Sequence, residues 1–276
     1  MPTAAINGVD LYYELHGDSG EPLVLVHGYT GDISDWRHQI PEFSPTHRVL
    51  ILDLRGHGRS QAPPDRSAYT VPQMSQDVEA LAEHVGLDRY HLLGHSMGGA
   101  VVQEIAVRSP QKLLSLTLQD TAHRFNLNAD PLIAAWRDLR FRLAETEGMA
   151  AVAAMEQPLP PPPHMPAERL EETKDRLSRM SVDAFIGSWN GLAAWEGTEG
   201  GAHNIETPTL IIYGDLDVPL LIKASLKLAQ LIPDAAVEVI PETGHSPQWG
   251  RPALFNAALR RFLEQVTASP LGQQLA

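Results

Sequence analysis

The sequence predicts an α/β protein with a doubly wound, mostly parallel sheet and one helical insertion. Short apolar runs bounded by Gly and Pro recur along the chain, and such runs are typical of strands buried on both faces. Helical patterns alternate with these runs, which implies right-handed crossovers between parallel strands. The alternation stops from Phe125 to Ile205, where no strand-like run occurs, so we expect a helical insertion there.

The first expected strand alternates polar and apolar residues from Val9 to Leu15, after the turn signal Asn7-Gly8. The later expected strands are continuous apolar runs, two of which continue into glycine-containing loops. They lie within Pro22–Gly28, Arg48–Gly58, Tyr90–Ser96, Leu113–Asp120, Pro208–Asp217 and Ala236–His245. Sequential strands of this type favour one large sheet with a buried centre.

Helical patterns lie between these strands, and prolines mark several of their first turns, where a missing N–H costs little. The expected helices are Val71–Val85, Gly99–Ser109, Leu220–Leu231 and Pro252–Val266. The insertion adds two helical patterns, Trp136–Met155 and Pro166–Trp195, separated by the proline-rich stretch Pro158–Pro166. We interpret that stretch as an extended, stiff connector in preference to a docking site for a proline-binding partner.

Composition excludes several classes of function. The 276 residues include 21 Lys and Arg but 34 Asp and Glu, a formal net charge of −13, so nucleic acid and anionic membranes are unfavourable partners. The absence of cysteine excludes disulfides, thiolate nucleophiles and cysteine-based metal sites. No run approaches the ~18 apolar residues of a membrane span, and the N-terminal stretch does not resemble a signal peptide. We therefore expect a cytoplasmic protein.

A serine lies where an expected strand meets an expected helix, within the stretch GHSMG from Gly94 to Gly98. In that context the pattern G-x-S-x-G describes a sharp, strained turn from which the serine Oγ projects. The two glycines remove side chains that would collide with the neighbouring strand and helix. A glycine-rich turn alone occurs by chance, so the strand–turn–helix context is what makes Ser96 the candidate nucleophile.

A serine nucleophile needs a base, and the base needs an orienting carboxylate. Among 12 histidines, His245 is the best candidate because it follows the last expected strand in a loop that leads into the last helix. Asp217, beyond the strand Pro208–Tyr213, is the first choice for the carboxylate. Asp215 is the reserve and Asp120 a weaker third candidate, also at a strand's carboxyl end. The chain order Ser, Asp, His matches that of serines on this type of turn.

An oxyanion formed at an acyl carbon needs two backbone N–H donors. We expect one from Met97, which follows the serine, and one from Tyr29 in the loop after an earlier strand. His27 and Gly28 would shape that loop.

Five stretches together resemble the α/β-hydrolase superfamily. They are HGYTGDISDW, DLRGHGRS, GHSMGG, GDLDVP and GHSP, in this order along the chain. Their order and spacing resemble those of its serine carboxylesterase, lactonase and cofactor-free haloperoxidase-like members. The resemblance covers almost the whole chain and is weak from Phe125 to Ile205.

This resemblance implies an eight-stranded sheet, with residues 1–124 and 206–276 as the core and residues 125–205 as a helical cap. It also implies a triad of Ser96, Asp217 and His245 and an oxyanion hole from the Tyr29 and Met97 N–H groups. A serine at the nucleophile position departs from the dehalogenase and epoxide-hydrolase branches, which use aspartate there.

Other conspicuous residues are expected to be structural. Arg55, His57 and Arg59 in DLRGHGRS would organise their loop, and His95 would pack or bond under the turn. The chain has no H-E-x-x-H, G-x-x-x-x-G-K-[ST] or G-x-G-x-x-G motif, so we expect no metal, nucleotide, flavin or other cofactor.

The expected partner is a small ester-like substrate under the cap, cleaved by acyl transfer through an acyl-enzyme. Candidate pocket residues, each of which could equally be cap–core packing, are Phe125, Trp136, Met155, Trp189, Trp195 and Trp249. Two alternatives stay open. One is a carbon–carbon bond hydrolase or perhydrolase with the same triad, and the other is a slow-turnover ligand receptor with the same fold. The oligomeric state is not predicted.

Overall fold

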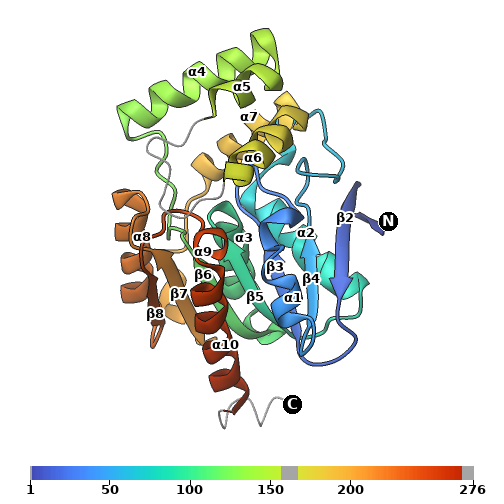
Figure 1. The fold of residues 1–276 in the computed structure, drawn as a ribbon, viewed down its shortest axis with the longest axis vertical. Helices are drawn as coiled ribbons and strands as arrows, with labels where there is room; N and C mark the ends of the chain where they lie inside the picture. Colours follow the sequence, from blue (N-terminus) through green and yellow to red (C-terminus); the bar gives the residue numbers. More distant parts are fainter. Residues whose placement is uncertain (1, 157–166, 269–276) are drawn as a thin grey trace.

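The computed structural model describes residues 2–156 and 167–268, which form the predicted α/β architecture (Figure 1). Eight strands lie in the order β1-β2-β4-β3-β5-β6-β7-β8. The strands are β1 (Thr3–Ile6), β2 (Val9–His16), β3 (Pro22–Val26), β4 (Arg48–Leu52), β5 (Tyr90–His95), β6 (Leu113–Gln119), β7 (Thr209–Gly214) and β8 (Ala236–Ile240). β2 is antiparallel to both of its neighbours, and the other pairs are parallel. The predicted doubly wound, mostly parallel sheet is confirmed.

Helices lie on both faces of the sheet and beyond one of its ends. They are α1 (Ile40–Phe43), α2 (Val71–His84), α3 (Met97–Arg108), α4 (Pro131–Glu147), α5 (Met149–Met155), α6 (Ala167–Arg179), α7 (Val182–Ala194), α8 (Pro219–Leu231), α9 (Pro247–Gly250) and α10 (Pro252–Ala268), with 3₁₀ turns η1 (Ile33–Trp36), η2 (Arg66–Ala68), η3 (Pro110–Lys112) and η4 (Ala202–Asn204). α2, α3 and α8 build one hydrophobic core against the sheet, and α1 and α10 build the other. The central strand β3 is therefore buried along its whole length, as its continuous apolar run predicts.

The expected first strand is preceded by another that we did not predict, β1. Asn7 and Gly8 have φ values of 46° and 81°, which makes them the two-residue turn of a β1–β2 hairpin in which Ile6 pairs with Val9. The turn signal was correct. The short strand before it carries two alanines and therefore no apolar run that would reveal it.

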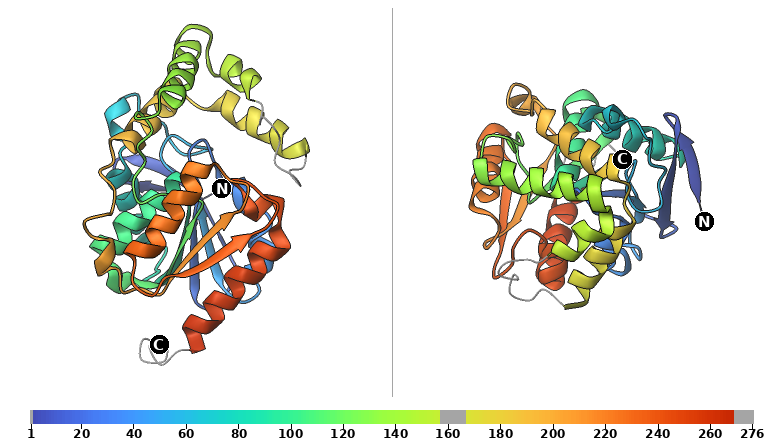
Figure 2. Two further views of the ribbon diagram at one scale, coloured as in Figure 1. Left: turned by 90° about the vertical axis from the view of Figure 1, so that its left-hand side faces the viewer. Right: turned by 90° about the horizontal axis from the view of Figure 1, so that it is seen from above.

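The helical insertion between β6 and β7 contains α4–α7, and each of its two predicted helical patterns is divided. Gly148, at φ 86°, ends α4 before α5 begins, and the hydroxyl of Ser181 caps the start of α7 after α6 has ended. The proline-rich stretch predicted as extended lies outside the described residues. Figures 1 and 2 show α4–α7 together at one end of the molecule. Arg169 of α6 lies over the ring of Trp249 in α9. Within residues 2–156 and 167–268, no helix is long and apolar enough to cross a membrane.

Candidate active site

Ser96 occupies the tight junction between β5 and α3. Its backbone has φ 53° and ψ −116°, a conformation that costs an L-residue on the order of 1–3 kcal/mol. The neighbouring strand β6 and the residues after it hold this turn. The Ser96 N–H donates to the Gln119 carbonyl oxygen at 2.9 Å, and the Thr121 hydroxyl donates to the Ser96 carbonyl oxygen at 2.7 Å.

The two glycines that flank the turn are required by close backbone approaches. A Cβ on Gly98 would lie 2.4 Å from the Val26 carbonyl oxygen and 2.5 Å from that of His27. A Cβ on Gly94 would lie 2.3 Å from the carbonyl oxygen of Gly98. These contacts are with backbone atoms that cannot swing aside, so the steric reason given for the glycines in the sequence analysis is confirmed.

Ser96, His245 and Asp217 form one hydrogen-bonded line. The Ser96 Oγ lies 2.9 Å from His245 Nε2, and the Asp217 Oδ2 lies 2.9 Å from His245 Nδ1. Because a carboxylate only accepts hydrogen bonds, Nδ1 carries the imidazole proton and Nε2 is left to accept from the serine hydroxyl. β5, β7 and β8 thus bring their following residues together at one edge of the sheet.

The electrostatics of the pair favour a carboxylate beside an imidazole that can become positively charged. Burial acts to raise the pKa of Asp217, but the His245 charge and hydrogen bond, with the Val218 N–H at 2.7 Å, hold that pKa below its ordinary value. Burial acts to lower the pKa of His245, and the Asp217 carboxylate overcomes this and raises it above the ordinary 6.5. The pair therefore stabilises a proton on the imidazole.

The three aspartates that the sequence offers as the orienting acid make different contacts in the structure. Asp217 bonds to His245, whereas the Asp215 carboxylate accepts from the Thr243 N–H at 3.3 Å. Asp120 is fully buried. One of its carboxylate oxygens lies within 4.8 Å of a carboxylate oxygen of Asp217 and of a ring nitrogen of His245. Burial and the nearby Asp217 charge raise the pKa of Asp120 well above its ordinary value. Asp120 is thus a second buried acid beside the line, in surroundings that disfavour its charged form.

The loop after β3 has its Gly28–Tyr29 peptide oriented by the His27 ring. His27 Nε2 accepts from the Leu54 N–H at 3.0 Å, so the ring proton is on Nδ1, which donates to the Gly28 carbonyl oxygen at 2.8 Å. In a trans peptide the N–H points opposite to the carbonyl, so the Tyr29 N–H points away from the His27 ring. A Cβ placed on Gly28 would lie 3.0 Å from the Ser96 Cβ, which shows how closely this loop approaches the serine.

The Met97 N–H is oriented in the same way. The Ser96 carbonyl accepts from the Thr121 hydroxyl, which turns the N–H of the same peptide in the opposite direction. In the part of the chain that the structure describes, neither the Met97 nor the Tyr29 N–H has a hydrogen-bond partner. The Met97 and Tyr29 N–H groups are thus two unpaired backbone donors in the segments that meet at the serine.

His95 was expected to pack or bond under the serine turn, and it forms a hydrogen bond there. Burial and the neighbouring His245 lower the pKa of His95 to about 3, so the ring is neutral. Its Nε2 donates to the His245 carbonyl oxygen at 2.7 Å. This bond fastens the loop that carries His245 to the turn that carries Ser96.

The residues of DLRGHGRS organise their loop. The Arg55 guanidinium forms two bonds to the Asp77 carboxylate of α2, at 2.5 and 2.8 Å, with both side chains buried. His57 Nδ1 donates to the Arg55 carbonyl oxygen at 3.0 Å. Arg59 lies over the Tyr12 ring, 4.5 Å from its centroid. None of these residues contacts Ser96, His245 or Asp217 through a bond within the described residues.

The aromatic candidates fall into separate groups. The ring centroids of Trp136 and Trp189 lie 5.8 Å apart, and those of Trp189 and Tyr29 lie 5.6 Å apart. Phe125 and Trp195 lie 6.4 Å apart, and both belong to the main core, which favours the packing alternative for these two. In addition, Trp249 is buried under Arg37 and Arg169, while Met155 is exposed.

A buried ion cluster that was not predicted from the sequence joins α6 to η1. Asp35 lies 2.5 Å from Arg169 and 2.8 Å from Arg176, and Arg176 also lies 3.3 Å from Asp32. Burial would raise the pKa of Asp35, but the two arginines hold it well below its usual range. The partners are more than 130 positions apart in the sequence, so no local pattern could have paired them.

Comparison with known proteins adds evidence beyond the geometry. A family model described as the alpha/beta hydrolase fold matches residues 21–252. A protein of Azorhizobium caulinodans named as carbamate hydrolase RutD is 29% identical, covering 96% of this chain and 99% of that protein. The enol-lactonase of Burkholderia xenovorans LB400 has a TM-score of 0.84 at 27% identity, covering 95% and 100% of the two chains. A thermophilic esterase of Thermogutta terrifontis has a TM-score of 0.81 at 28% identity, covering 96% and 97%.

Proposed function

The chain belongs to the α/β-hydrolase family, and from this premise we propose that it is a serine hydrolase that cleaves a small carboxylic ester or lactone. The single observation that carries the proposal is the hydrogen-bonded line from Ser96 Oγ through His245 to the buried Asp217 carboxylate. This line contains a nucleophile, a base and an orienting acid in the geometry that acyl transfer requires.

In the proposed first half-reaction, His245 Nε2 takes the proton of the Ser96 hydroxyl as Oγ forms a bond to the acyl carbon. The Asp217 carboxylate keeps the proton on Nδ1 and stabilises the imidazolium that results. Collapse of the tetrahedral intermediate breaks the bond to the leaving oxygen, which takes the proton from His245. An ester then releases its alcohol, whereas a lactone stays attached to Ser96 as an opened acyl chain.

In the second half-reaction, water replaces the serine as the nucleophile. His245 takes a proton from water, the hydroxide adds to the acyl carbon, and Ser96 leaves with that proton. In both halves the Tyr29 and Met97 N–H groups would donate to the oxyanion. The fixed direction of both donors supports this role, because preorganised donors need no rearrangement as charge develops.

We further propose that residues 125–205 act as a cap over a core of residues 1–124 and 206–276. α7 supports this role, because Phe185 and Trp189 of that helix lie 5.6 Å from the Tyr29 ring, beside one of the proposed oxyanion donors. Trp136 of α4 extends this aromatic group. A small apolar acyl or alcohol part is the substrate feature that such a surface favours.

The experiment that tests the proposal is hydrolysis of p-nitrophenyl acetate, butyrate and octanoate, with a simple lactone and a carbamate ester as further arms. We expect turnover in the wild-type protein and its almost complete loss in Ser96→Ala, with an unchanged circular dichroism spectrum. Ser178→Ala, at an exposed position on α6, is the matched control and should keep full activity. Substantial activity in Ser96→Ala would refute the mechanism.

The substrate arms also separate the alternatives. The preferred arm identifies the acyl group, and the chain-length trend measures the space that is available to it. If the wild-type protein turns over no arm, the ester and lactone proposal fails. A carbon–carbon bond hydrolase or perhydrolase, or a receptor of slow turnover, would then be tested by product analysis and by ligand-dependent capture.

A further inference from the structure

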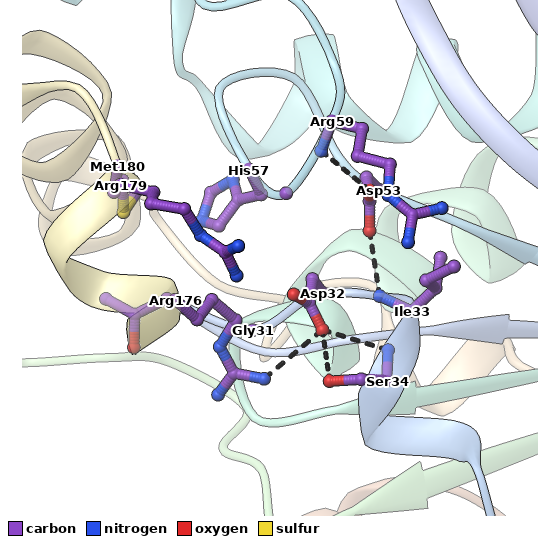
Figure 3. Close-up of a pocket in the computed structure, with 12 residues that line it drawn as sticks. Gly31, Asp32, Ile33, Ser34, Asp53, His57, Arg59, Arg176, Arg179 and Met180 are labelled. Carbon is purple, nitrogen blue, oxygen red and sulfur yellow. Dashed lines mark hydrogen bonds and ion pairs between the residues drawn. The ribbon is translucent and has the colours of Figure 1, made fainter. Parts of the chain in front are cut away.

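A polar cavity of about 240 Å³ lies between the loop after β3, the loop after β4 and helix α6 (Figure 3). Thr30, Gly31 and Asp32 line it from the first loop, and His57 and Arg59 from the second. α6 contributes Arg176 and Arg179. None of the three residues of the hydrogen-bonded line is among its lining residues, so the cavity is distinct from the proposed active site.

The lining of this cavity contains more basic than acidic side chains. It contains three arginines (Arg59, Arg176 and Arg179) and two aspartates (Asp32 and Asp53). Burial raises the pKa of Asp53 to about 7, so this carboxyl group is only partly ionised at neutral pH. Figure 3 shows the Arg179 guanidinium directed between His57 on one side and Arg176 and Asp32 on the other.

Two polar groups that line the cavity lack a partner within the described residues. Arg176 is 9% exposed, and its Nε has no hydrogen-bond partner although its Nη1 pairs with Asp32 and Asp35. His57 is 1% exposed, and its Nε2 also has none. A buried polar atom without a partner is costly, so both groups favour a polar occupant.

The two unpaired atoms need opposite partners. Arg176 Nε carries a hydrogen and needs an acceptor. His57 Nδ1 donates to the Arg55 carbonyl oxygen, and burial together with His27 lowers the pKa of His57 to about 3, so the ring is neutral. Its Nε2 is therefore a bare acceptor and needs a donor. An occupant that offers an acceptor oxygen and a hydroxyl or amide hydrogen would satisfy both atoms, and the arginine charge favours an anionic oxygen.

We propose that this cavity is a binding site for a small hydroxycarboxylate anion. The carboxylate would accept from Arg176 Nε and from the Arg179 guanidinium, and the hydroxyl would donate to His57 Nε2. Charge-assisted bonds of this kind are the stronger class of hydrogen bond. The proposal goes beyond the proposed hydrolase function and does not rest on it, because it uses other residues.

The test is calorimetric titration of the full chain with three probes at constant ionic strength. Lactate offers both features, propionate lacks the hydroxyl, and lactamide lacks the charge. We expect lactate to bind about tenfold more tightly than propionate, which corresponds to one hydrogen bond, and lactamide to bind least. Arg179→Gln should weaken lactate binding about tenfold, and this exposed side chain can be replaced without loss of the fold.

Two control variants separate the site from a general charge effect. Arg142→Gln removes an exposed arginine of α4 that does not line the cavity and should leave the affinity unchanged. Asp175→Asn removes the ion-pair partner of Arg179 but keeps the guanidinium, and should not weaken binding. The absence of lactate binding, equal binding of lactate and propionate, or an unaffected Arg179→Gln would each overturn the proposal.

Discussion

Replacing Asp217 by Asn tests the proposed triad more sharply than removing the side chain, because a neighbouring N–H dictates how the amide must point. The Val218 N–H donates to Asp217 Oδ1 at 2.7 Å, while Oδ2 faces His245 Nδ1 at 2.9 Å. In the variant, the amide oxygen must stay at Val218, which places the NH₂ group against Nδ1. Nδ1 must then accept, so the proton moves to Nε2, which can no longer accept from Ser96.

The expected loss follows from this reversed tautomer and from the lost charge. Asp217 is 1% exposed, so solvent cannot replace its carboxylate beside the imidazolium. A wrong tautomer in a triad of this type lowers turnover by about 10⁴, and we expect a fall of about 10³–10⁴ in kcat. This corresponds to about 4–5.5 kcal/mol of transition-state stabilisation. KM should change little, because Asp217 touches no substrate.

The assay is p-nitrophenyl butyrate hydrolysis with kcat and KM measured separately. Asp215→Asn is the matched control, because its carboxylate accepts a bond from the Thr243 N–H and not from His245, and we expect a change of less than about threefold. Asp120→Asn tests the remaining acid. If Asp217→Asn keeps a tenth or more of wild-type kcat, or if Asp120→Asn causes the larger loss, the assignment of Asp217 as the orienting acid is refuted.

Three further outcomes are expected. The proposed base His245 must be neutral to act, and the Asp217 charge raises its pKa, so kcat/KM should rise with pH through a limb above pH 6.5. Asp217→Asn should move the limb of its residual activity to lower pH, and a wild-type limb below pH 6 would contradict this. Gly98→Ala should lower kcat by at least about 100-fold, since its Cβ would lie 2.4 Å from a backbone oxygen and displace the serine turn; activity near wild type would show that the turn tolerates the shift. Asp77→Asn should lower the free energy of unfolding by about 3–5 kcal/mol in urea titrations, because Arg55 would keep a buried charge without its partner. The control is Glu171→Gln, which removes a charge from an exposed ion pair and should have no measurable effect.

The sequence could predict the sheet and the convergence of the site for the same physical reason. Strands such as β3 and β5 are buried along their whole length, so they need continuous apolar runs that are visible locally. Parallel strands place their carboxyl ends at one edge. Polar residues that follow such runs, such as Ser96 and Asp217, are therefore brought together by the topology without any knowledge of side-chain positions.

The features that escaped prediction depend on distant partners or on weak local signals. β1 is stabilised by its hairpin with β2 and lacks an apolar run of its own. The bonds of Arg169 and Arg176 to Asp35 join segments that no periodicity relates. Asp120 lies near the Asp217–His245 pair because of the register in which β6 pairs with β7. That register cannot be read from either strand's sequence alone.

The strain of the serine turn and the direction of the proposed oxyanion donors both depend on hydrogen bonds to backbone groups. The Thr121 hydroxyl and the Gln119 carbonyl hold Ser96 at φ 53°, and the same Thr121 bond turns the Met97 N–H to the opposite side of its peptide. His27 does the equivalent for the Tyr29 N–H by holding the Gly28 carbonyl. Both donors are thus fixed before any substrate arrives, by hydrogen bonds to the carbonyl oxygens of their own peptides. The folding free energy that sustains the strained turn therefore also supplies the preorganisation that the proposed oxyanion hole needs.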